Sequence, residues 1–358
     1  MIKSIAIGFI SLSIIFSCSN PSSPKTEKRV QLIVEGNIDK DMTWEKRNDI
    51  VIKGIVKVDS GVNLIIEPDV HITIEGQGSF IQIYGSISAN GKDTTTSILF
   101  KASEEHNTNK WQKCLSALDR SKLNLAFCKF DGFLIAISNE YGNLIVDNST
   151  FINCNRGIYN VQTDTCKIQQ CIFTDNEFDI TFERAMVTDI NKNLVLNCVF
   201  QRSKEIGVKA TNKAYVSIIN NQFIYCKMGI FCEFATTAMI QNNTFHNCET
   251  GIRFYLCSGY GKIYKNEIYQ SAYGIILANA NPPINYNNLL TCNFFKIQSI
   301  RNVEGNVNAK NNWWGTYNED EIRLSIQDAN DDDAQSDAGL IEYLPIMNGR
   351  IEDAGILR

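Results

Sequence analysis

Hydrophobic side chains recur along most of this chain with a period of about 22 residues. The apolar positions that set the period, called anchors below, are Phe130, Phe151, Phe173, Phe200, Phe223, Phe245, Ile268, Leu290 and Trp314. Apolar and polar residues alternate around the anchors, and asparagine or glycine interrupts the repeats, a pattern typical of short strands rather than helices. A unit of this length cannot bury its own apolar face, so the period predicts stacked coils that bury one another.

Residues in phase with the anchors predict how the coils stack. Two positions before the anchor we expect an asparagine ladder of Asn221, Asn243, Asn266, Asn288 and Asn312, since asparagine tolerates a left-handed bend and its amide bonds to the next amide in a stack. Three positions after the anchor, small residues predict a tight corner at Cys154, Ser203, Cys226, Cys248 and Ser271. The predicted fold is all-β: a right-handed parallel β-helix, with the hand that parallel crossovers generally take.

The first 17 residues have the features of a lipoprotein signal peptide. Lys3 precedes an apolar run over Ile5–Phe16, which is too short to span a bilayer. Residues 15–18 (IFSC) resemble a bacterial lipobox, which implies cleavage before Cys18 and attachment of a membrane-anchoring lipid to its sulfur. The alternative is an ordinary secretory signal. Either way we expect a location in the cell envelope, and Ser19 in place of aspartate favours the outer membrane.

The remaining chain divides into three predicted parts. Residues 18–46 form a lipidated tether and N-terminal cap, residues 47–316 form the β-helix, and residues 317–358 form a C-terminal cap. Within this cap, NEDEIRLSIQ has a capping box of Asn318 and Glu321 before an apolar face. This pattern predicts a short helix that covers the last coil.

Charge and composition exclude several function classes. A net charge of −5 and a pI near 5.4 argue against a nucleic-acid partner. Most cysteines other than Cys18 fall on repeat positions, where they are expected to act as small buried hydrophobes, although an oxidised Cys226–Cys248 pair stays open. Without C-x-x-C motifs or clustered histidines, we expect no cofactor and no zinc or redox site. The acidic run over residues 328–337 leaves a calcium site as a less favoured alternative to a solvated turn.

The alternation of the strands also predicts a solvent-facing row of functional side chains. Residues eight and ten positions after each anchor should point outward, with the Phe200 repeat running one residue late. The candidate ligand-binding residues on this face are Tyr159, Lys209, Phe231, Arg253 and Tyr255. Aromatic planes stack on the apolar faces of sugars, and cations meet uronate carboxylates. The face therefore predicts a polysaccharide site.

Several segments resemble a known family, the bacterial right-handed parallel β-helix repeat lipoproteins with a pectate-lyase-like solenoid. They are LIIEPDVHI from Leu64, YGSISANG from Tyr84, NNWWGT from Asn311 and IEYLPIM from Ile341. With the middle repeats, the resemblance covers about residues 50–347. It implies the β-helix strongly and specifies an activity hardly at all.

Two functions remain open at this stage. We favour a membrane-anchored exported module for binding, adhesion or structure, whose partner is a polysaccharide or another cell-surface component. The alternative is an enzyme, because β-helices similar to this one include pectate lyases, polygalacturonases and alginate epimerases. For such an enzyme the candidate catalytic residues are Glu183, Glu233 and Arg253. The two glutamates would lie two coils and ~10 Å apart, near the separation used by inverting glycosidases.

Overall fold

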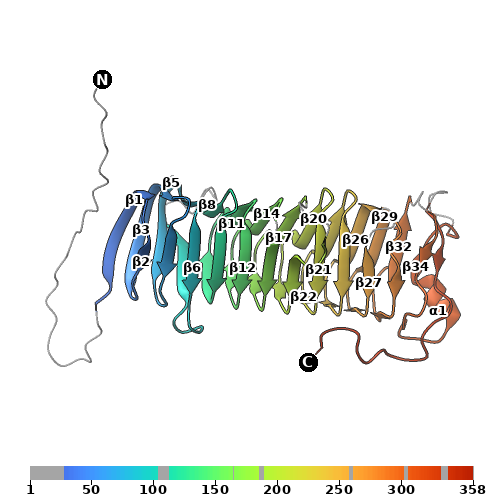
Figure 1. Cartoon of the computed structure of the whole chain (residues 1–358). Coiled ribbons are helices and arrows are strands. Elements are labelled where there is room, and N and C mark those ends of the chain that lie inside the picture. The colour runs from blue at the N-terminus through green and yellow to red at the C-terminus, as the bar shows by residue number, and fades with distance from the viewer. Residues whose placement is uncertain are drawn as a thin grey trace, which may run out of the picture.

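The structure, a computed structural model, describes residues 28–103, 113–163, 165–184, 189–257, 261–301, 305–331 and 338–357. The predicted signal peptide and Cys18 lie outside the described residues. Throughout the described part the chain winds into one elongated solenoid whose strands pair in parallel with those of the next coil (Figure 1). The predicted right-handed parallel β-helix is confirmed, and its coils repeat about every 22 residues.

Each coil contributes up to three strands, which stack into two large sheets. The first three long strands of the 22-stranded sheet are β1 (Val30–Ile38), β3 (Asn48–Val58) and β5 (His71–Ile83). Its short anchor strands are β7 (Ile98–Ala102), β10 (Cys128–Asp131), β13 (Thr150–Ile152), β16 (Ile172–Thr174), β19 (Val199–Gln201), β22 (Gln222–Ile224), β25 (Thr244–His246), β28 (Glu267–Tyr269) and β31 (Asn288–Leu289). Its other strands are β8 (Lys113–Ala117), β11 (Ile135–Glu140), β14 (Arg156–Val161), β17 (Phe178–Glu183), β20 (Ile206–Thr211), β23 (Met228–Glu233), β26 (Thr250–Cys257), β29 (Tyr273–Ala280), β32 (Ile297–Ile300) and β34 (Ile326–Gln327).

The 11-stranded sheet forms another side of the coil. It contains β2 (Met42–Trp44), β4 (Asn63–Ile66), β6 (Ser86–Asn90), β9 (Lys122–Ala126), β12 (Asn143–Asp147), β15 (Thr165–Gln169), β18 (Asn193–Leu196), β21 (Tyr215–Ile219), β24 (Thr237–Gln241), β27 (Lys262–Tyr264) and β30 (Ile284–Asn285). Near the C-terminus, β33 (Val307–Asn308) pairs with β35 (Ile341–Glu342), and α1 covers Glu319–Leu324.

The anchors stack into a continuous apolar column. Strand register places its members in the order Leu32, Ile50, Ile72, Phe100, Phe130, Phe151, Phe173, Phe200, Phe223, Phe245, Ile268 and Leu289. From Phe100 to Phe245 the rings are nearly parallel, with centroids 4.6–5.1 Å apart. The column therefore follows the ~4.8 Å spacing between paired strands and starts earlier than the sequence pattern indicated.

Two predicted members of the inner rows are wrong by one residue. Leu289 is buried and pairs with Ile268, while Leu290 is partly exposed, so Leu290 is not an anchor. The same slip replaces Asn288 by Asn287 in the ladder. Because two asparagines precede two leucines here, the sequence NNLL fits the repeat equally well if it is shifted by one residue. Only the hydrogen bonds of the folded chain show which asparagine and which leucine lie inside.

The asparagine ladder is otherwise confirmed. Each side-chain amide donates to the side-chain oxygen of the next asparagine at 2.9–3.0 Å, in the order Asn221, Asn243, Asn266, Asn287 and Asn312. Each of these oxygens also accepts a backbone N–H of the preceding coil at 2.8–2.9 Å. All five side chains are fully buried. The ladder therefore satisfies buried polar groups at a point where the backbone turns.

The cysteines take the structural role predicted for most of them. Eleven described cysteines are free thiols, and all except Cys292 are buried. Burial raises the pKa of the Cys114, Cys166 and Cys232 thiols. Side chains of this kind are neutral and act as small hydrophobes.

The C-terminal end of the solenoid is covered by its own cap. The side-chain oxygen of Asn318 accepts the backbone N–H groups of Asp320 and Glu321 at 3.0 and 3.4 Å, and its amide donates to the Glu321 carboxylate at 3.3 Å. The predicted N-cap residue Asn318 therefore starts α1, whose buried Ile322 packs on the core. The reciprocal bond of a capping box is not formed, because the backbone N–H of Asn318 donates to Oγ1 of Thr316. Trp314 contacts Tyr343 edge to face at 6.1 Å between ring centroids.

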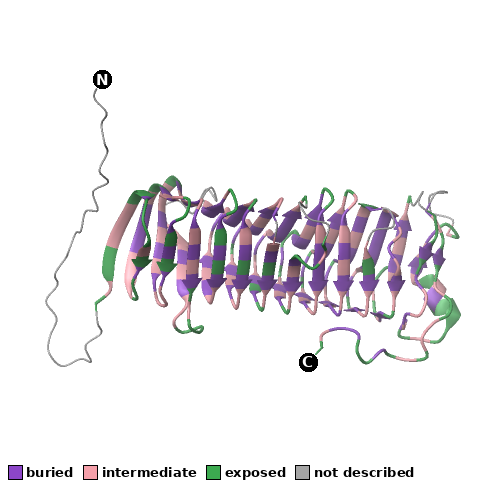
Figure 2. Cartoon of the chain, viewed as in Figure 1, coloured by how far each residue is buried: buried purple, intermediate pink, exposed green. Residues whose placement is uncertain are grey.

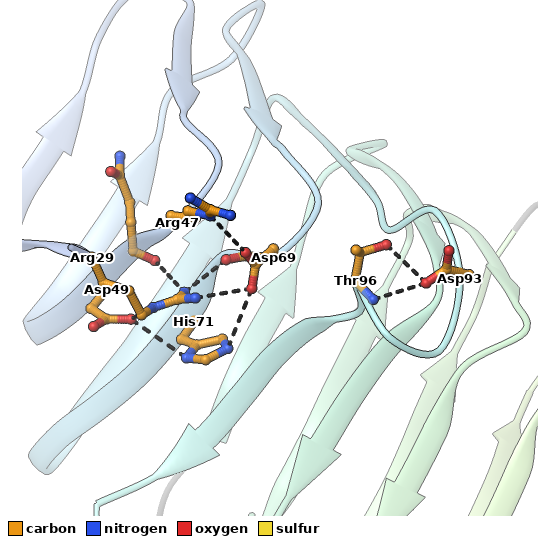
Figure 3. A network of polar contacts seen from close by, with 8 residues as sticks. Arg29, Arg47, Asp49, Asp69, His71, Asp93 and Thr96 are labelled. Atoms are coloured by element: carbon orange, nitrogen blue, oxygen red, sulfur yellow. Dashed lines mark hydrogen bonds and ion pairs between the residues drawn. The ribbon is translucent and has the colours of Figure 1, made fainter. Parts of the chain in front are cut away.

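At the opposite end a polar network ties the first coils together (Figure 3). Arg29 donates to the carboxylates of Asp49 and Asp69, the latter at 2.9 Å. Arg47 and His71 also approach these two carboxylates, at 3.5–4.0 Å. Burial, followed by the charge of Arg29, lowers the pKa of His71. The network therefore links β3 and β5 to the residue directly before β1.

Candidate functional site

The register brings the predicted outward residues into two adjacent rows. Eight positions after the anchor, Cα partners follow in the order Tyr159, Thr181, Lys209, Phe231 and Arg253. Ten positions after the anchor, Glu233 pairs with Tyr255, and Glu183 lies two coils earlier. Side chains alternate between buried and partly exposed along β14, β23 and β26 (Figure 2). The predicted outward position is wrong in other coils, where Ser138, Thr181 and Ile276 are buried. We call the outer surface of β14, β17, β20, β23 and β26 the aromatic face.

Phe231 lies between two cations on this face. Its ring centroid is 5.6 Å from Nζ of Lys209 and 5.7 Å from Cζ of Arg253. Both distances are within the range of cation–π attraction. Lys209 is also neutralised, because its Nζ is 2.8 Å from Oε1 of Glu233. The cluster therefore combines one aromatic ring, one ion pair and a second cation.

Arg253 carries the unsatisfied polar group of the cluster. Its Nε is buried and has no hydrogen-bond partner in the part of the chain that the structure describes. A buried donor of this kind is unfavourable unless an acceptor satisfies it. A guanidinium group in this position suits a carboxylate, a sulfate or a sugar hydroxyl.

Tyr159 belongs to a second cluster on the same face. Its hydroxyl donates to Oε2 of Glu183, and Cζ of Arg156 lies 5.0 Å from its ring centroid. Burial, followed by the Glu183 hydrogen bond and charge, raises the pKa of Tyr159 to about 12. Glu183 also accepts the Asn212 amide at 3.3 Å. Tyr159 therefore stays protonated and is held in place.

The candidate catalytic residues are engaged in separate interactions. Glu183 bonds to Tyr159 and Asn212, whereas Glu233 pairs with Lys209. Glu233 thus pairs with Lys209, and Arg253 lies on the other side of Phe231. A catalytic role for Glu183, Glu233 or Arg253 stays a prediction.

A hollow of about 600 Å³ adjoins the aromatic face and was not predicted. It is lined by Gln162, Arg184, Asn212, Lys213, Phe234, Ala235 and Leu256. All seven residues have positive φ angles, and they follow or end the strands that carry the aromatic face. We call this row the turn ridge. The signal in the sequence is a wholly apolar residue, Phe234 or Leu256, at a corner where the other coils have tyrosine, glutamine, asparagine or arginine.

A second hollow, of about 940 Å³, lies under the C-terminal segment. It is lined by Gln222, Ile224, Thr244, His246, Glu267, Tyr269, Arg350, Glu352, Asp353, Ala354, Gly355, Ile356 and Leu357. The segment runs back along the coils (Figure 1) and is held by contacts such as Arg350–Glu267 at 2.6 Å and Leu357–Asn220 at 2.6 Å. Because these partners lie far apart in the chain, periodicity gives no sign of them.

The described residues offer little to a metal ion. Across these residues there is no cluster of three or more histidine, cysteine, aspartate or glutamate side chains suited to one. Of the acidic run considered for calcium, Asp328 and Asp331 both bind Arg323, at 3.1 and 2.9 Å, while residues 332–337 lie outside the described residues. Within the described ranges, no helix is long and apolar enough to cross a membrane.

Comparison with known proteins assigns the coils to a family. The family model described as "Periplasmic copper-binding protein (NosD)" matches residues 121–325, which is more than half of the chain. The chain belongs to the NosD family. The matched region contains every residue named above on the aromatic face and the turn ridge of this NosD-family protein.

Comparisons with solved structures and with curated proteins give little information beyond the NosD family. The solved structure titled "Crystal structure of PfbA, a surface adhesin of Streptococcus pneumoniae" matches with 13% sequence identity and a TM-score of 0.46, covering 70% of this chain and 83% of that chain. So distant a match says nothing about what this chain binds. The comparison with curated proteins found no match.

Proposed function

We propose that this NosD-family protein is an extracytoplasmic β-helix module that binds polysaccharide on its aromatic face and is held at the outer membrane by a lipid on Cys18. The periplasmic description of the family supports a location outside the cytoplasm. The signal-peptide pattern of residues 1–17 points the same way.

The observation that carries the binding proposal is the Phe231–Arg253 pair. Phe231 is an aromatic side chain on the outer face of β23, so it adds nothing to the apolar column inside its own coil. Arg253 beside it keeps a buried Nε without a partner among the described residues. A sugar ring on Phe231 with an acceptor group beside the guanidinium group of Arg253 would contact both side chains.

Copper does not enter this proposal, although the family description names it. Copper sites use cysteine, histidine or methionine ligands in close groups. In the described part of the chain His71 contacts aspartates and His246 contacts Gln270 and Asn247. The described cysteines are buried in or against the core. The described residues therefore do not fit a copper centre.

A glycan screen on the full-length protein in detergent tests the binding function. We expect wild-type protein to bind a polysaccharide and the Phe231→Ala/Arg253→Ala double variant to lose that binding at an unchanged melting temperature. Tyr225→Ala is the matched control, because Tyr225 is an exposed aromatic residue outside the aromatic face. A large fall in the melting temperature of the double variant would show that the two side chains serve packing instead.

The anchor is tested separately by Cys18→Ser. Removing the sulfur removes the attachment point of the lipid, so we expect the variant in the soluble fraction and the wild type with membranes. If the variant still fractionates with membranes, the anchor lies elsewhere.

The enzymatic alternative predicts products rather than binding alone. A lyase, hydrolase or epimerase would change the size or composition of a bound uronate polymer. We expect no change beyond the level of a Glu183→Gln/Glu233→Gln variant. A difference between the two proteins would replace the binding module by an enzyme.

A further inference from the structure

The hollow at the turn ridge is built partly from bulky side chains in an uncommon backbone conformation. Phe234 and Leu256 have φ angles of 55° and 54°. This left-handed region is unfavourable for large side chains and is most readily adopted by glycine, asparagine and aspartate. At the corresponding corner of the other coils φ is also positive, at 45–64°, for Tyr141, Gln162, Arg184, Asn212, Asn279 and Arg301. The left-handed bend is therefore common to the row, and what distinguishes these two coils is that Phe234 and Leu256 place wholly apolar side chains there.

These two side chains also gain little from burial. Phe234 is 42% exposed and Leu256 is 36% exposed. Exposed apolar side chains that lie together can serve as a contact surface for a ligand. The ridge therefore holds apolar surface that is available to a ligand.

Two cations border the same hollow. The side chains of Arg184 and Lys213 form no ion pair or hydrogen bond with other described residues. The carboxylate of Glu183, which precedes Arg184 in the chain, is already bonded to Tyr159 and Asn212. In a chain with a net charge of −5, this corner is a local positive site.

The hollow is continuous with the aromatic face. Phe234 contacts Tyr255 edge to face, with ring centroids 5.8 Å apart. Asn212 reaches Glu183 at 3.3 Å. Leu256 lies on β26, the strand that presents Arg253 and Tyr255. One extended ligand can therefore contact both the face and the ridge.

We infer that the turn ridge is a subsite for the acidic groups of an anionic glycan. Arg184 and Lys213 would hold a carboxylate or sulfate group, and Phe234 and Leu256 would contact the apolar face of a sugar ring. Uronate carboxylates and sulfate esters share this chemistry. The inference rests on the proposed function, and it specifies the ligand class and extends the site around the edge of the sheet.

The charge arm of the test uses two variants with the same change in net charge. Arg184→Gln/Lys213→Gln alters the ridge, while Lys122→Gln/Lys167→Gln removes two exposed lysines from the 11-stranded sheet. Binding is measured against an oligouronate, a sulfated oligosaccharide and a neutral oligosaccharide of equal length. We expect the ridge variant to bind the anionic ligand at least about tenfold more weakly, and the control to stay close to wild type. The stronger of the two anionic ligands identifies which acidic group is recognised.

The conformational arm uses Phe234→Asn. Asparagine suits the left-handed backbone, so we expect an equal or higher melting temperature together with weaker glycan binding. A purely structural role of Phe234 would instead lower the melting temperature or leave binding unchanged.

The outcomes separate this inference from the proposed function. If wild-type protein binds no glycan, both fail. If it binds anionic glycans and the ridge variant binds them equally well, or if it binds the neutral ligand as tightly, the ridge subsite fails and the aromatic face stands.

Discussion

The anchor column inside the solenoid and the outer row of the aromatic face follow opposite rules. On β26, Ile252 and Phe254 are fully buried, with Ile252 between Ile230 and Ile275, whereas Arg253 and Tyr255 are partly exposed. In the anchor column, phenylalanine follows phenylalanine for seven coils. Outside, the row eight positions after the anchor changes residue in each coil, reading Ser138, Tyr159, Thr181, Lys209, Phe231, Arg253, Ile276 and Gln298.

This difference shows that the anchor column specifies the fold, whereas the outer row can vary to suit a function. A buried side chain is surrounded by the coils before and after it, so its size and shape are set by its neighbours. In the outer row, Ser138, Thr181 and Ile276 are buried as well. The partly exposed side chains of Tyr159, Lys209, Phe231 and Arg253 are less restricted and can be selected for a ligand. Outer-row substitutions should therefore affect binding, and inner-row substitutions should affect stability.

The largest effect is expected in the phenylalanine column. Phe245→Ala removes a ring that stacks on Phe223 at 4.8 Å and leaves a cavity in the core, so we expect a loss of about 3–5 kcal/mol in the free energy of unfolding. Urea denaturation measures it. The neighbouring outward substitution, His246→Ala, should cost about 1 kcal/mol or less. Equal losses for the two variants would contradict the division between inner and outer rows.

A buried aspartate, Asp179, interrupts an inner row of glycines, and its effect on stability depends on pH. In this row the backbone of the next coil leaves no room for a side chain at Gly157, Gly207 and Gly229. Asp179 takes the equivalent place in its own coil and is fully buried. Its carboxyl oxygens accept the Asn176 amide at 2.8 Å and the Ser203 hydroxyl. Burial raises the pKa of Asp179 well above its ordinary value of 3.8.

The sign of the resulting pH dependence follows from this shift. Above the ordinary pKa the unfolded chain has lost a proton that the folded chain keeps, so the free energy of unfolding falls as the pH rises toward the folded-state pKa. Asp179→Asn has no carboxyl group at this position, so this fall in the free energy of unfolding is absent from the variant. We expect the melting temperature of the variant, relative to wild type, to increase from about pH 4 to about pH 7.

Asp175→Asn is the control for this prediction. The hydrogen bond from Arg202 lowers the pKa of Asp175, so this carboxylate stabilises the fold above its ordinary pKa and ceases to do so as the pH falls. Its variant should lose relative stability as the pH rises, which is the opposite trend. The same trend in both variants would show that Asp179 is ionised in the folded protein.

Periodicity predicted the inner rows well because stacking imposes them. The phenylalanine anchors, most of the asparagine ladder and the helix N-cap at Asn318 all follow from local residue types and spacing. The slip at Leu290 occurred where two asparagines precede two leucines and only hydrogen bonding sets the phase. The turn ridge and the C-terminal segment depend on backbone angles and on contacts such as Leu357–Asn220, which join residues 137 positions apart.

The smallest effect should appear when an outer residue changes next to an inner one. Ile172 is 46% exposed on β16, and its neighbour Phe173 on the same strand is fully buried. Threonine keeps the β-branched shape that suits a strand, so Ile172→Thr should change the free energy of unfolding by no more than about 0.5 kcal/mol. Urea denaturation with an unchanged m-value is the measurement. A loss above about 1 kcal/mol would mean that Ile172 packs against another part of the protein. The outer rows would then be constrained by structure as well, and a hydrophobic or aromatic residue in them would no longer point to a ligand.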